Sequence, residues 1–238
     1  MRKATSKKKT PPPVPEIRPA PSLDSESNLS EKAYLAILQG LFDRTIPAGS
    51  EYSQAQLMRL LGLTASPLRD ALRILENEGL VTIYARSCIR FLRADLELSR
   101  STYQFRSFIE RPGARALAEK GDAAEIRNLI DAHVALLDQL EHGELGPTEQ
   151  RTLDALENRL HGALTFYLRN PLVDTTARRL KNYLTLVRLD WLTTTPLAIR
   201  TVREHIDILE ACARRDADAA EAALATHFQQ ALQRLLGI

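Results

Sequence analysis

The chain has 238 residues, of which 44% are hydrophobic and 5% aromatic. This length exceeds that of a usual single domain, and the apolar fraction excludes a wholly disordered chain. The formal net charge is +2, but the positive excess lies in residues 1–94, since residues 95–238 carry eighteen basic and twenty-one acidic side chains. We therefore expect a polyanion to bind the N-terminal part of the chain.

Cys88 and Cys212 are the only cysteines of the sequence. Two cysteines so far apart exclude a disulfide framework and a CxxC metal knuckle, which fits a reducing cytosol. No apolar stretch approaches the length of a membrane span, and the Lys-rich start lacks the apolar centre of a signal peptide. We therefore expect a soluble, cytoplasmic protein without a membrane partner.

The N-terminal part divides into an arm and a small domain. Residues 1–28 are rich in Lys, Pro and Ser and have little to bury, so we expect a disordered basic arm. Residues 29–94 predict a small domain of three helices and two strands. In chain order these elements are a helix over 29–42, a turn at 46–50, a helix from its N-cap Ser53 to Leu61, a helix from Thr64 or Ser66 to Asn77, and strands over 80–84 and 88–92.

A short helix, a glycine turn, a second helix and a hairpin follow one another in a winged helix-turn-helix, whose second helix enters the major groove of DNA. Here that helix separates an apolar face from a polar face that carries Arg69 and Arg73, one turn apart. Two exposed arginines alone favour a solvated helix, but the turn and the hairpin favour contact with base edges or phosphates. The predicted DNA-contacting residues are Ser53, Thr64, Ser66, Arg69, Arg73 and Arg86.

Residues 95–238 show only helical periodicity. The breaks at glycines and prolines predict six helices, over 95–120, 122–142, 147–169, 172–193, 197–214 and 216–236. Long helices with short connections favour antiparallel neighbours in a bundle. The predicted fold class is mainly α: a winged helix-turn-helix followed by an antiparallel all-helical domain.

Histidines form a pattern in the predicted bundle. Glu157 and His161 are one helical turn apart, and His205 and His227 lie on apolar faces of two further helices. Converging imidazoles with a carboxylate suit Zn²⁺, or Mn²⁺ or Ni²⁺, with coordination positions left open. The alternative is three core histidines satisfied by hydrogen bonds. His133 and His142 show no comparable pattern, so we place neither in the site.

Residues Gly62–Val81 resemble the signature of the GntR family of regulators, and Ile46–Gly49 resembles the turn that precedes it. Ala65 stands where the family usually has an arginine, and the hairpin tip lacks its usual glycines. Residues 98–236 are similar to the FCD type of the FadR-like subfamily, through the motifs Tyr103–Pro112, His161 with Asn170-Pro171, and Glu204–Leu209. The resemblance implies that Glu157, His161, His205 and His227 occupy the family's metal-ligand positions, and that Arg106 binds the carboxylate of a small organic acid.

The function that follows is that of a ligand-responsive transcription regulator, not an enzyme. The resemblance implies a homodimer that binds a pseudo-palindromic site on double-stranded DNA and senses a small organic acid in the helical domain. Two alternatives stay open at this point. One is a metal-dependent hydrolase that uses the Glu/His cluster, and the other is a ligand-binding protein whose DNA specificity has degraded.

Overall fold

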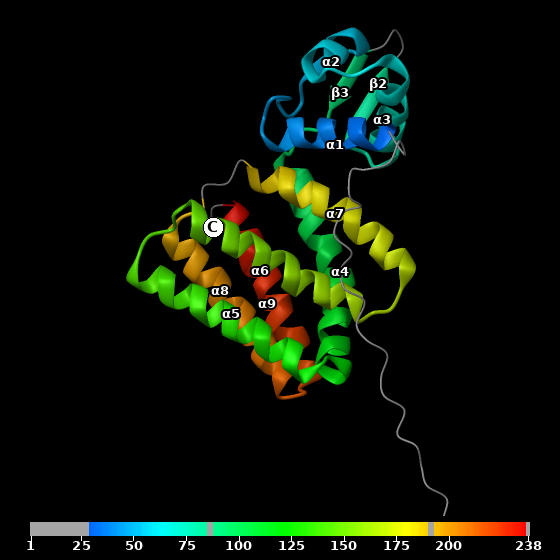
Figure 1. Ribbon diagram of the computed structural model, residues 1–238. Helices are drawn as coiled ribbons and strands as arrows, with labels where there is room; N and C mark the ends of the chain where they lie inside the picture. The colour runs from blue at the N-terminus through cyan, green and yellow to red at the C-terminus, as the bar shows by residue number, and fades with distance from the viewer. Residues whose placement is uncertain (1–28, 85–87, 190–192, 237–238) are drawn as a thin grey trace, which may run out of the picture.

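The computed structural model describes residues 29–84, 88–189 and 193–236. Figure 1 shows a small N-terminal domain above a larger group of long helices, with α7 passing between them. The fold class is the predicted one, a winged helix-turn-helix joined to an all-helical domain. The predicted arm over residues 1–28, and Arg86, lie outside the described residues. No helix of the described part has the length and hydropathy that would let it span a membrane.

The N-terminal domain combines three helices with a small antiparallel sheet. Its elements are α1 (Leu29–Phe42), β1 (Glu51–Ser53), α2 (Gln54–Leu61), α3 (Ala65–Asn77), β2 (Val81–Tyr84) and β3 (Cys88–Phe91). The strand order is β1-β3-β2, with Tyr52 opposite Ile89 and Ile83 opposite Ile89 on the other side. The three-residue strand β1 was not predicted, because its sequence is too short for a period-two pattern and it is a strand only through pairing with β3.

The helix boundaries of this domain follow from capping. Ser53 caps α2 in a capping box, in which its hydroxyl accepts from the amide of Gln56 and the Gln56 side chain accepts from the amide of Ser53. Gly62 ends α2 in the left-handed region with φ of 66°, which costs glycine little. Together these caps fix the short α2 against α3.

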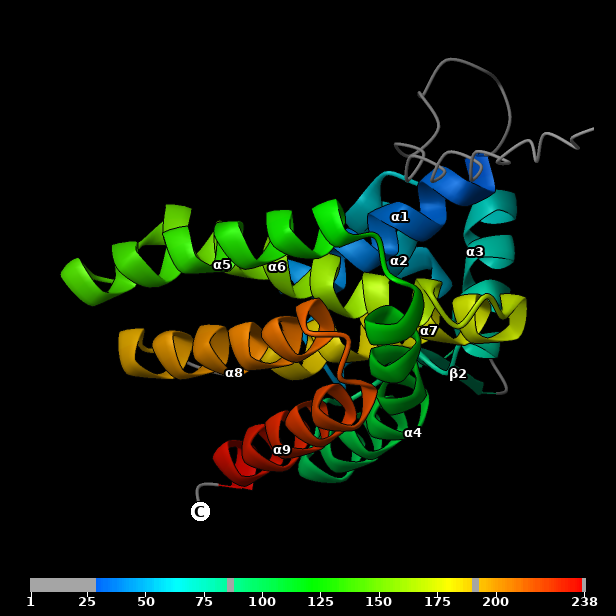
Figure 2. The same ribbon diagram turned by 90° about the horizontal axis from the view of Figure 1, so that it is seen from below.

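Six long helices form the C-terminal domain. They are α4 (Leu96–Lys120), α5 (Ala123–His142), α6 (Pro147–Phe166), α7 (Pro171–Leu189), α8 (Thr195–Ala213) and α9 (Ala217–Leu236). Figure 2, seen from below, shows α5 and α6 side by side, with α8 and then α9 below them in this view. The first helix, α4, packs along the last, α9, where Tyr103 meets Phe228 edge to face and Arg111 pairs with Glu221.

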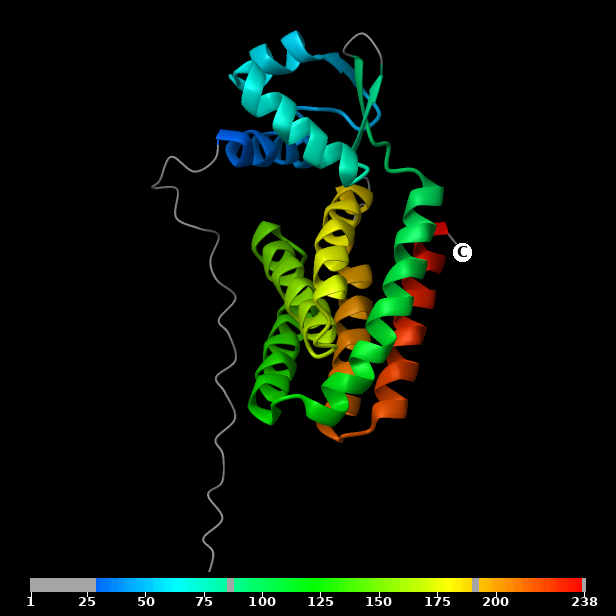
Figure 3. The same cartoon turned by 90° about the vertical axis from the view of Figure 1, so that its right-hand side faces the viewer.

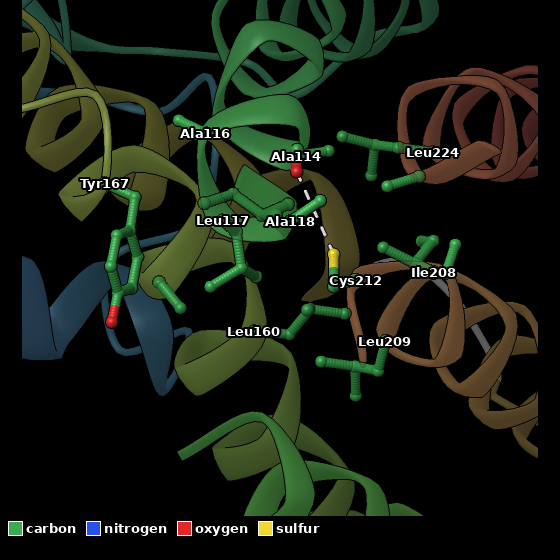
Figure 4. Packing of buried hydrophobic residues seen from close by; sticks show 14 of the residues in the cluster. Ala114, Ala116, Leu117, Ala118, Leu160, Tyr167, Ile208, Leu209, Cys212 and Leu224 are labelled. Atoms are coloured by element: carbon green, nitrogen blue, oxygen red, sulfur yellow. Dashed lines mark hydrogen bonds between the residues drawn. The ribbon is translucent and has the colours of Figure 1, made fainter. Parts of the chain in front are cut away.

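Small residues let the helices of this domain approach closely. Gly113 of α4 lies directly against the carbonyl of Leu164 in α6, where a Cβ atom would collide with the backbone. Figure 4 shows the core beside this contact, where Leu117, Leu160 and Leu209 are fully buried. Each buried leucine contributes roughly 1.5–3 kcal/mol relative to an exposed one. The close α4–α6 contact brings the polar residues of these two helices within reach of each other.

Helix α7 contacts α1 of the N-terminal domain as well as α4 and α6 of the C-terminal domain. Figures 1 and 3 both show it below the N-terminal domain, with α3 ending close to it in Figure 3. Leu186 of α7 is buried in the same apolar cluster as Ile37, Leu72 and Leu80 of the N-terminal domain. The two domains therefore share one core at this helix.

The turn after α3 predicts an experiment on this shared region. Gly79 and Gly62 both have positive φ, of 78° and 66°, but a Cβ at Gly79 would also collide with the Tyr183 hydroxyl, whereas Gly62 has nothing within 4 Å. We expect Gly62→Ala to cost about 1 kcal/mol of unfolding free energy from backbone strain. Gly79→Ala should cost distinctly more in thermal unfolding. Equal losses would contradict a tight contact between α7 and this turn.

Candidate functional site

The recognition helix α3 has the two faces that the sequence predicts. Its apolar face is fully buried, with Leu68, Ala71, Leu72 and Leu75 at 0–1% exposure. Ser66, Arg69 and Arg73 are exposed on the opposite face, as is Thr64 at the N-cap. The Thr64 side chain forms no cap hydrogen bond, so its hydroxyl stays available for other partners.

On the exposed face of α3, the acidic residue has a partner among the described residues and the arginines do not. Asp70 accepts a hydrogen bond from the Ser30 hydroxyl, at 3.1 Å, and is thereby held toward α1. Within the described part of the chain, Arg69 and Arg73 form no comparable bond or ion pair and are free to meet an external anion. Ser53, also predicted to contact DNA, uses its hydroxyl in the capping box of α2.

The second site lies inside the C-terminal domain, where three helices each contribute a histidine. His161 of α6, His205 of α8 and His227 of α9 are 8%, 0% and 3% exposed. One ring nitrogen of each lies within 4.8 Å of those of the other two. The histidines that the sequence placed on three separate faces therefore meet at one point.

Each of these three histidines uses its Nδ1 for an outer partner. His161 Nδ1 lies 2.5 Å from Glu110 Oε2, and His227 Nδ1 lies 2.7 Å from Glu204 Oε2. A carboxylate accepts hydrogen bonds, so both rings carry their proton on Nδ1. Their Nε2 atoms then hold free lone pairs. Such an outer hydrogen bond orients an imidazole and raises its basicity as a metal ligand.

The third histidine is oriented by a fourth. His133 Nδ1 lies 2.7 Å from the carbonyl of Leu129, which can only accept, so His133 Nε2 is itself an acceptor. His205 Nδ1 lies 3.3 Å from this atom and donates to it. The lone pair of His205 is thus also on Nε2. His133, which we did not place in the site, thus contacts His205 and orients its ring, whereas His142 is exposed at the end of α5.

A carboxylate accompanies the histidines, as predicted. Glu157, 5% exposed, places Oε2 3.5 Å from His161 Nε2 and Oε1 3.6 Å from His205 Nε2. The same Oε2 accepts a hydrogen bond of 2.6 Å from Arg188 of α7. Glu157 therefore lies between the cluster and a guanidinium that the sequence analysis did not include.

Burial and charge set the protonation of this site. Burial lowers the pKa of His205 well below its ordinary value, and burial followed by the Arg106 charge lowers the pKa of His161. Although burial opposes ionisation of Glu110, Arg106 and His161 bring its pKa to about 2. Against burial, Arg188 and His205 hold the pKa of Glu157 well below its usual range. The site thus combines the neutral imidazoles of His161 and His205 with ionised carboxylates.

The residues present fit a divalent metal ion. His161 Nε2 and His205 Nε2 are buried and have no hydrogen-bond partner. A buried polar atom without a partner costs about 1–3 kcal/mol, so two of them side by side need an explanation. Three imidazole nitrogens and a carboxylate are a ligand set for Zn²⁺ and related ions.

Arg106, the predicted effector residue, is buried beside this cluster. It lies one turn before Glu110 on α4 and pairs with it through Nε at 2.7 Å. Its guanidinium carbon also lies 5.1 Å from the centre of the Phe228 ring. The remaining Nη1 is buried and lacks a hydrogen-bond partner. This arginine is thus only partly satisfied by the protein.

A cleft of about 670 Å³ lies between α8 and α9. Its walls include Glu204 and His227, the outermost pair of the cluster, whereas His161, His205 and Arg106 do not line it. Arg200 and Arg203 also line this cleft.

Some residues of the site had a detectable sequence signal and others had none. His133 follows Ile126 and Leu129 and precedes Leu136 and Leu140 at alternating spacings of three and four, which marks the buried face of α5. Glu204 lies in the motif Glu204–Leu209, but the spacing of residues does not show its role or that of Arg188, because their partners lie on other helices. Only the packing of the domain brings them to the cluster.

A winged helix-turn-helix joined to a helical domain with its own internal site defines a class, the DNA-binding transcriptional regulators with an effector domain. Family comparison matches residues 29–91 to the bacterial regulatory proteins of the gntR family and residues 101–230 to the FCD domain. The chain belongs to the GntR family of bacterial regulatory proteins and carries an FCD domain behind its DNA-binding domain.

Individual relatives agree with this assignment. The chain is 22% identical to the HTH-type transcriptional regulator YdhC of Bacillus subtilis (strain 168), over 90% of this chain and 93% of the relative. It is 27% identical to the Nta operon transcriptional regulator of Aminobacter aminovorans, over 80% and 86%. Similar folds are a GntR regulator from Rhodococcus sp. RHA1, with 20% identity, TM-score 0.68 and coverage of 87% and 97%, and E. coli McbR/YncC, with 16%, 0.67, 88% and 98%.

Proposed function

We propose that this regulator binds a pseudo-palindromic operator as a homodimer and changes its affinity when a metal-bound organic acid occupies the FCD domain. The observation that carries the proposal is the convergence of three histidine lone pairs, each fixed by an outer hydrogen bond, beside Glu157. A domain that only needed packing would not hold such a cluster without partners.

The proposed DNA-contacting surface is the exposed face of α3 with its flanks. Arg69 and Arg73 offer charged, forked donors for guanine edges or phosphates, and Ser66 and Thr64 offer hydroxyls at the start of the helix. Ser53 contributes by fixing α2 or through its backbone, and Arg86, also predicted to contact DNA, lies outside the described residues. Two copies of the chain would place two such helices about 34 Å apart on one face of DNA.

Selection of bound DNA from a random duplex pool tests the DNA-binding part. We expect a palindromic motif whose half-sites are about one helical turn apart. Arg69→Ala should weaken binding to that motif roughly 10- to 100-fold, because one good base contact contributes about 1–3 kcal/mol. Arg111→Ala, far from α3, is the control. A chain that recovers no motif, and whose weak DNA binding disappears with added salt, would instead have lost its sequence specificity.

The proposed metal ligands are His161, His205, His227 and Glu157, and the ion is Zn²⁺, with Mn²⁺ and Ni²⁺ as the other candidates. Four protein ligands from three helices would stabilise the folded domain, since a bound metal adds its binding free energy to folding. When bound, the ion supplies a Lewis-acidic position for an anionic oxygen. The outer partners Glu110, His133 and Glu204 hold the rings in place.

Metal content tests this part of the proposal. We expect about one Zn²⁺ per chain after loading, and almost none in His205→Ala, as measured by elemental analysis. His133→Ala should keep the ligands but weaken Zn²⁺ affinity about 10- to 100-fold, because His205 loses its orienting partner. His142→Ala, at an exposed histidine, is the matched control. Full zinc content in His205→Ala would show that the cluster is only part of the core.

Charge explains why the effector should be an acid. Around the cluster, each glutamate already has its own arginine: Glu110 with Arg106, Glu157 with Arg188, and Glu204 with Arg234. These pairs already balance the glutamates, so a divalent cation there would bring a buried excess of positive charge. An anion offsets such an excess. Arg106 Nη1, buried and unpartnered, has N–H groups left to donate to a carboxylate as a second anchor.

A panel of small mono-, di- and tricarboxylates tests the effector class. We expect some of these acids, but not their amides, to raise the melting temperature of the Zn²⁺-loaded protein. Arg106→Lys keeps a positive charge for Glu110 but loses the guanidinium fork, so acid affinity should fall about tenfold or more with zinc content unchanged. Arg111→Lys on the same helix is the control. Unaltered acid affinity in Arg106→Lys would remove this arginine from the site.

A further inference from the structure

Helix α7 connects the proposed metal site to the recognition helix. At its N-terminal side, Arg179 donates a hydrogen bond of 2.6 Å to the carbonyl of Asn77, the last residue of α3. One turn later, the Tyr183 hydroxyl donates to the carbonyl of Glu78. Both acceptors are carbonyls at the C-terminal end of α3, which have no partner inside the helix. Helix α7 thus caps the recognition helix from another domain.

Two further contacts attach α7 to the N-terminal domain. Asn182 donates to the Tyr34 hydroxyl of α1, at 3.2 Å, and that hydroxyl donates to the Glu78 carboxylate, at 2.8 Å. Leu186, 2% exposed, lies in the apolar core of the N-terminal domain. Helix α7 therefore contacts the N-terminal domain through hydrogen bonds and through apolar packing. Displacing α7 would change the position of the recognition helix.

The C-terminal end of α7 contacts a residue of the proposed metal site. Arg188 donates its bond of 2.6 Å to Glu157 Oε2, and it also hydrogen-bonds Tyr103 of α4. From Arg179 to Arg188 the helix spans only about 14 Å, at 1.5 Å per residue. A single rigid element thus reaches from the carbonyls of α3 to a carboxylate of the histidine cluster.

Glu157 is shared by two competing partners. Its Oε2 atom lies 2.6 Å from Arg188 and 3.5 Å from His161 Nε2, which faces the cluster. A carboxylate oxygen that ligates a cation gives up part of its negative charge to that cation. Its attraction for the guanidinium then falls, and like charges on the two sides of Glu157 repel each other. Occupancy of the cluster and the Arg188 pair are therefore coupled.

We propose that Arg188 is a positioning residue that couples occupancy of the histidine cluster to the pose of the recognition helix through α7. This inference rests on the proposed metal site and deepens it by naming the route of its regulation. Coupling of this kind is reciprocal: metal changes operator affinity, and operator binding changes metal affinity by the same factor. The structure supplies the contiguous contacts, from Glu157 through Arg188 and Tyr183 to Glu78, that such coupling needs.

The experiment compares operator affinity of the Zn²⁺-loaded and the Zn²⁺-stripped full chain, with the selected DNA motif as probe. In the wild type we expect the two affinities to differ by about fivefold or more. In Arg188→Gln the ratio should approach one, while Zn²⁺ binds equally or more tightly because a competing cation has been removed. Arg188→Lys should restore part of the ratio. Arg115→Gln, which breaks ion pairs with Asp218 and Glu221 away from the cluster, is the matched control.

Tyr183→Phe tests the other end of α7 without touching the metal site. It removes one hydroxyl from the carbonyl of Glu78, so the affinity ratio should fall while zinc affinity stays unchanged. Hydrogen exchange gives a readout that needs no DNA: Zn²⁺ should change the exchange of α7 amides in the wild type but not in Arg188→Gln. If Arg188→Gln does not fold, the affinity ratio of Tyr183→Phe and the hydrogen exchange of the wild type with and without Zn²⁺ test the coupling instead.

The outcomes separate this inference from the proposed function. If the wild type binds Zn²⁺ and the operator but neither affects the affinity for the other, the coupling is refuted. The metal site and the DNA-binding site are not affected by that result. A full affinity ratio in Arg188→Gln or weaker zinc binding in that variant also overturns it, since Arg188 would then act elsewhere or only support the cluster. A wild type that binds no Zn²⁺ refutes the metal site and the coupling with it.

Discussion

The three buried histidines of the FCD domain all donate Nδ1–H outward, and this shared constraint organises the surrounding helices. Glu110 of α4 accepts from His161, His133 of α5 from His205, and Glu204 of α8 from His227. Each acceptor lies on a different helix from its histidine, so the bonds tie α4 to α6, α5 to α8 and α8 to α9. Five of the six long helices are thereby held by the same polar cluster, and the remaining one, α7, joins through Arg188.

Buried charge is expensive unless it is paired, and this domain pairs it locally. The glutamates that orient or accompany the histidines each have an arginine within 2.7 Å, so the cluster stays close to neutral before any ligand enters. That balance avoids an uncompensated buried charge, although His161 Nε2 and His205 Nε2 still lack hydrogen-bond partners among the described residues. It also makes the site responsive to charge, because any ion that enters changes a nearly neutral environment.

The sequence was sufficient for the elements and for part of the site. Gly62 and Gly79, with positive φ, divide the N-terminal domain where the turns were predicted, and the long helices of the C-terminal domain begin and end close to the predicted residues. The histidines and Glu157 could be found because helical spacing shows which side chains share a face. Strand β1 could not, and neither could Arg188, because a pairing strand and an interhelical ion pair depend on which elements become neighbours, and periodicity within one segment does not contain that information.

The packing of α4 along α9 has a consequence for biosynthesis. These helices are the first and last of the domain, and the ion pair between Arg111 and Glu221 joins residues 110 positions apart. Contacts of such long sequence separation form late in folding, because the closure of a long loop costs entropy before any contact compensates it. His227 lies on α9, so a chain still emerging from the ribosome has its DNA-binding helices complete while the histidine cluster lacks a member. The sensor is thus assembled only after α9 has been synthesised.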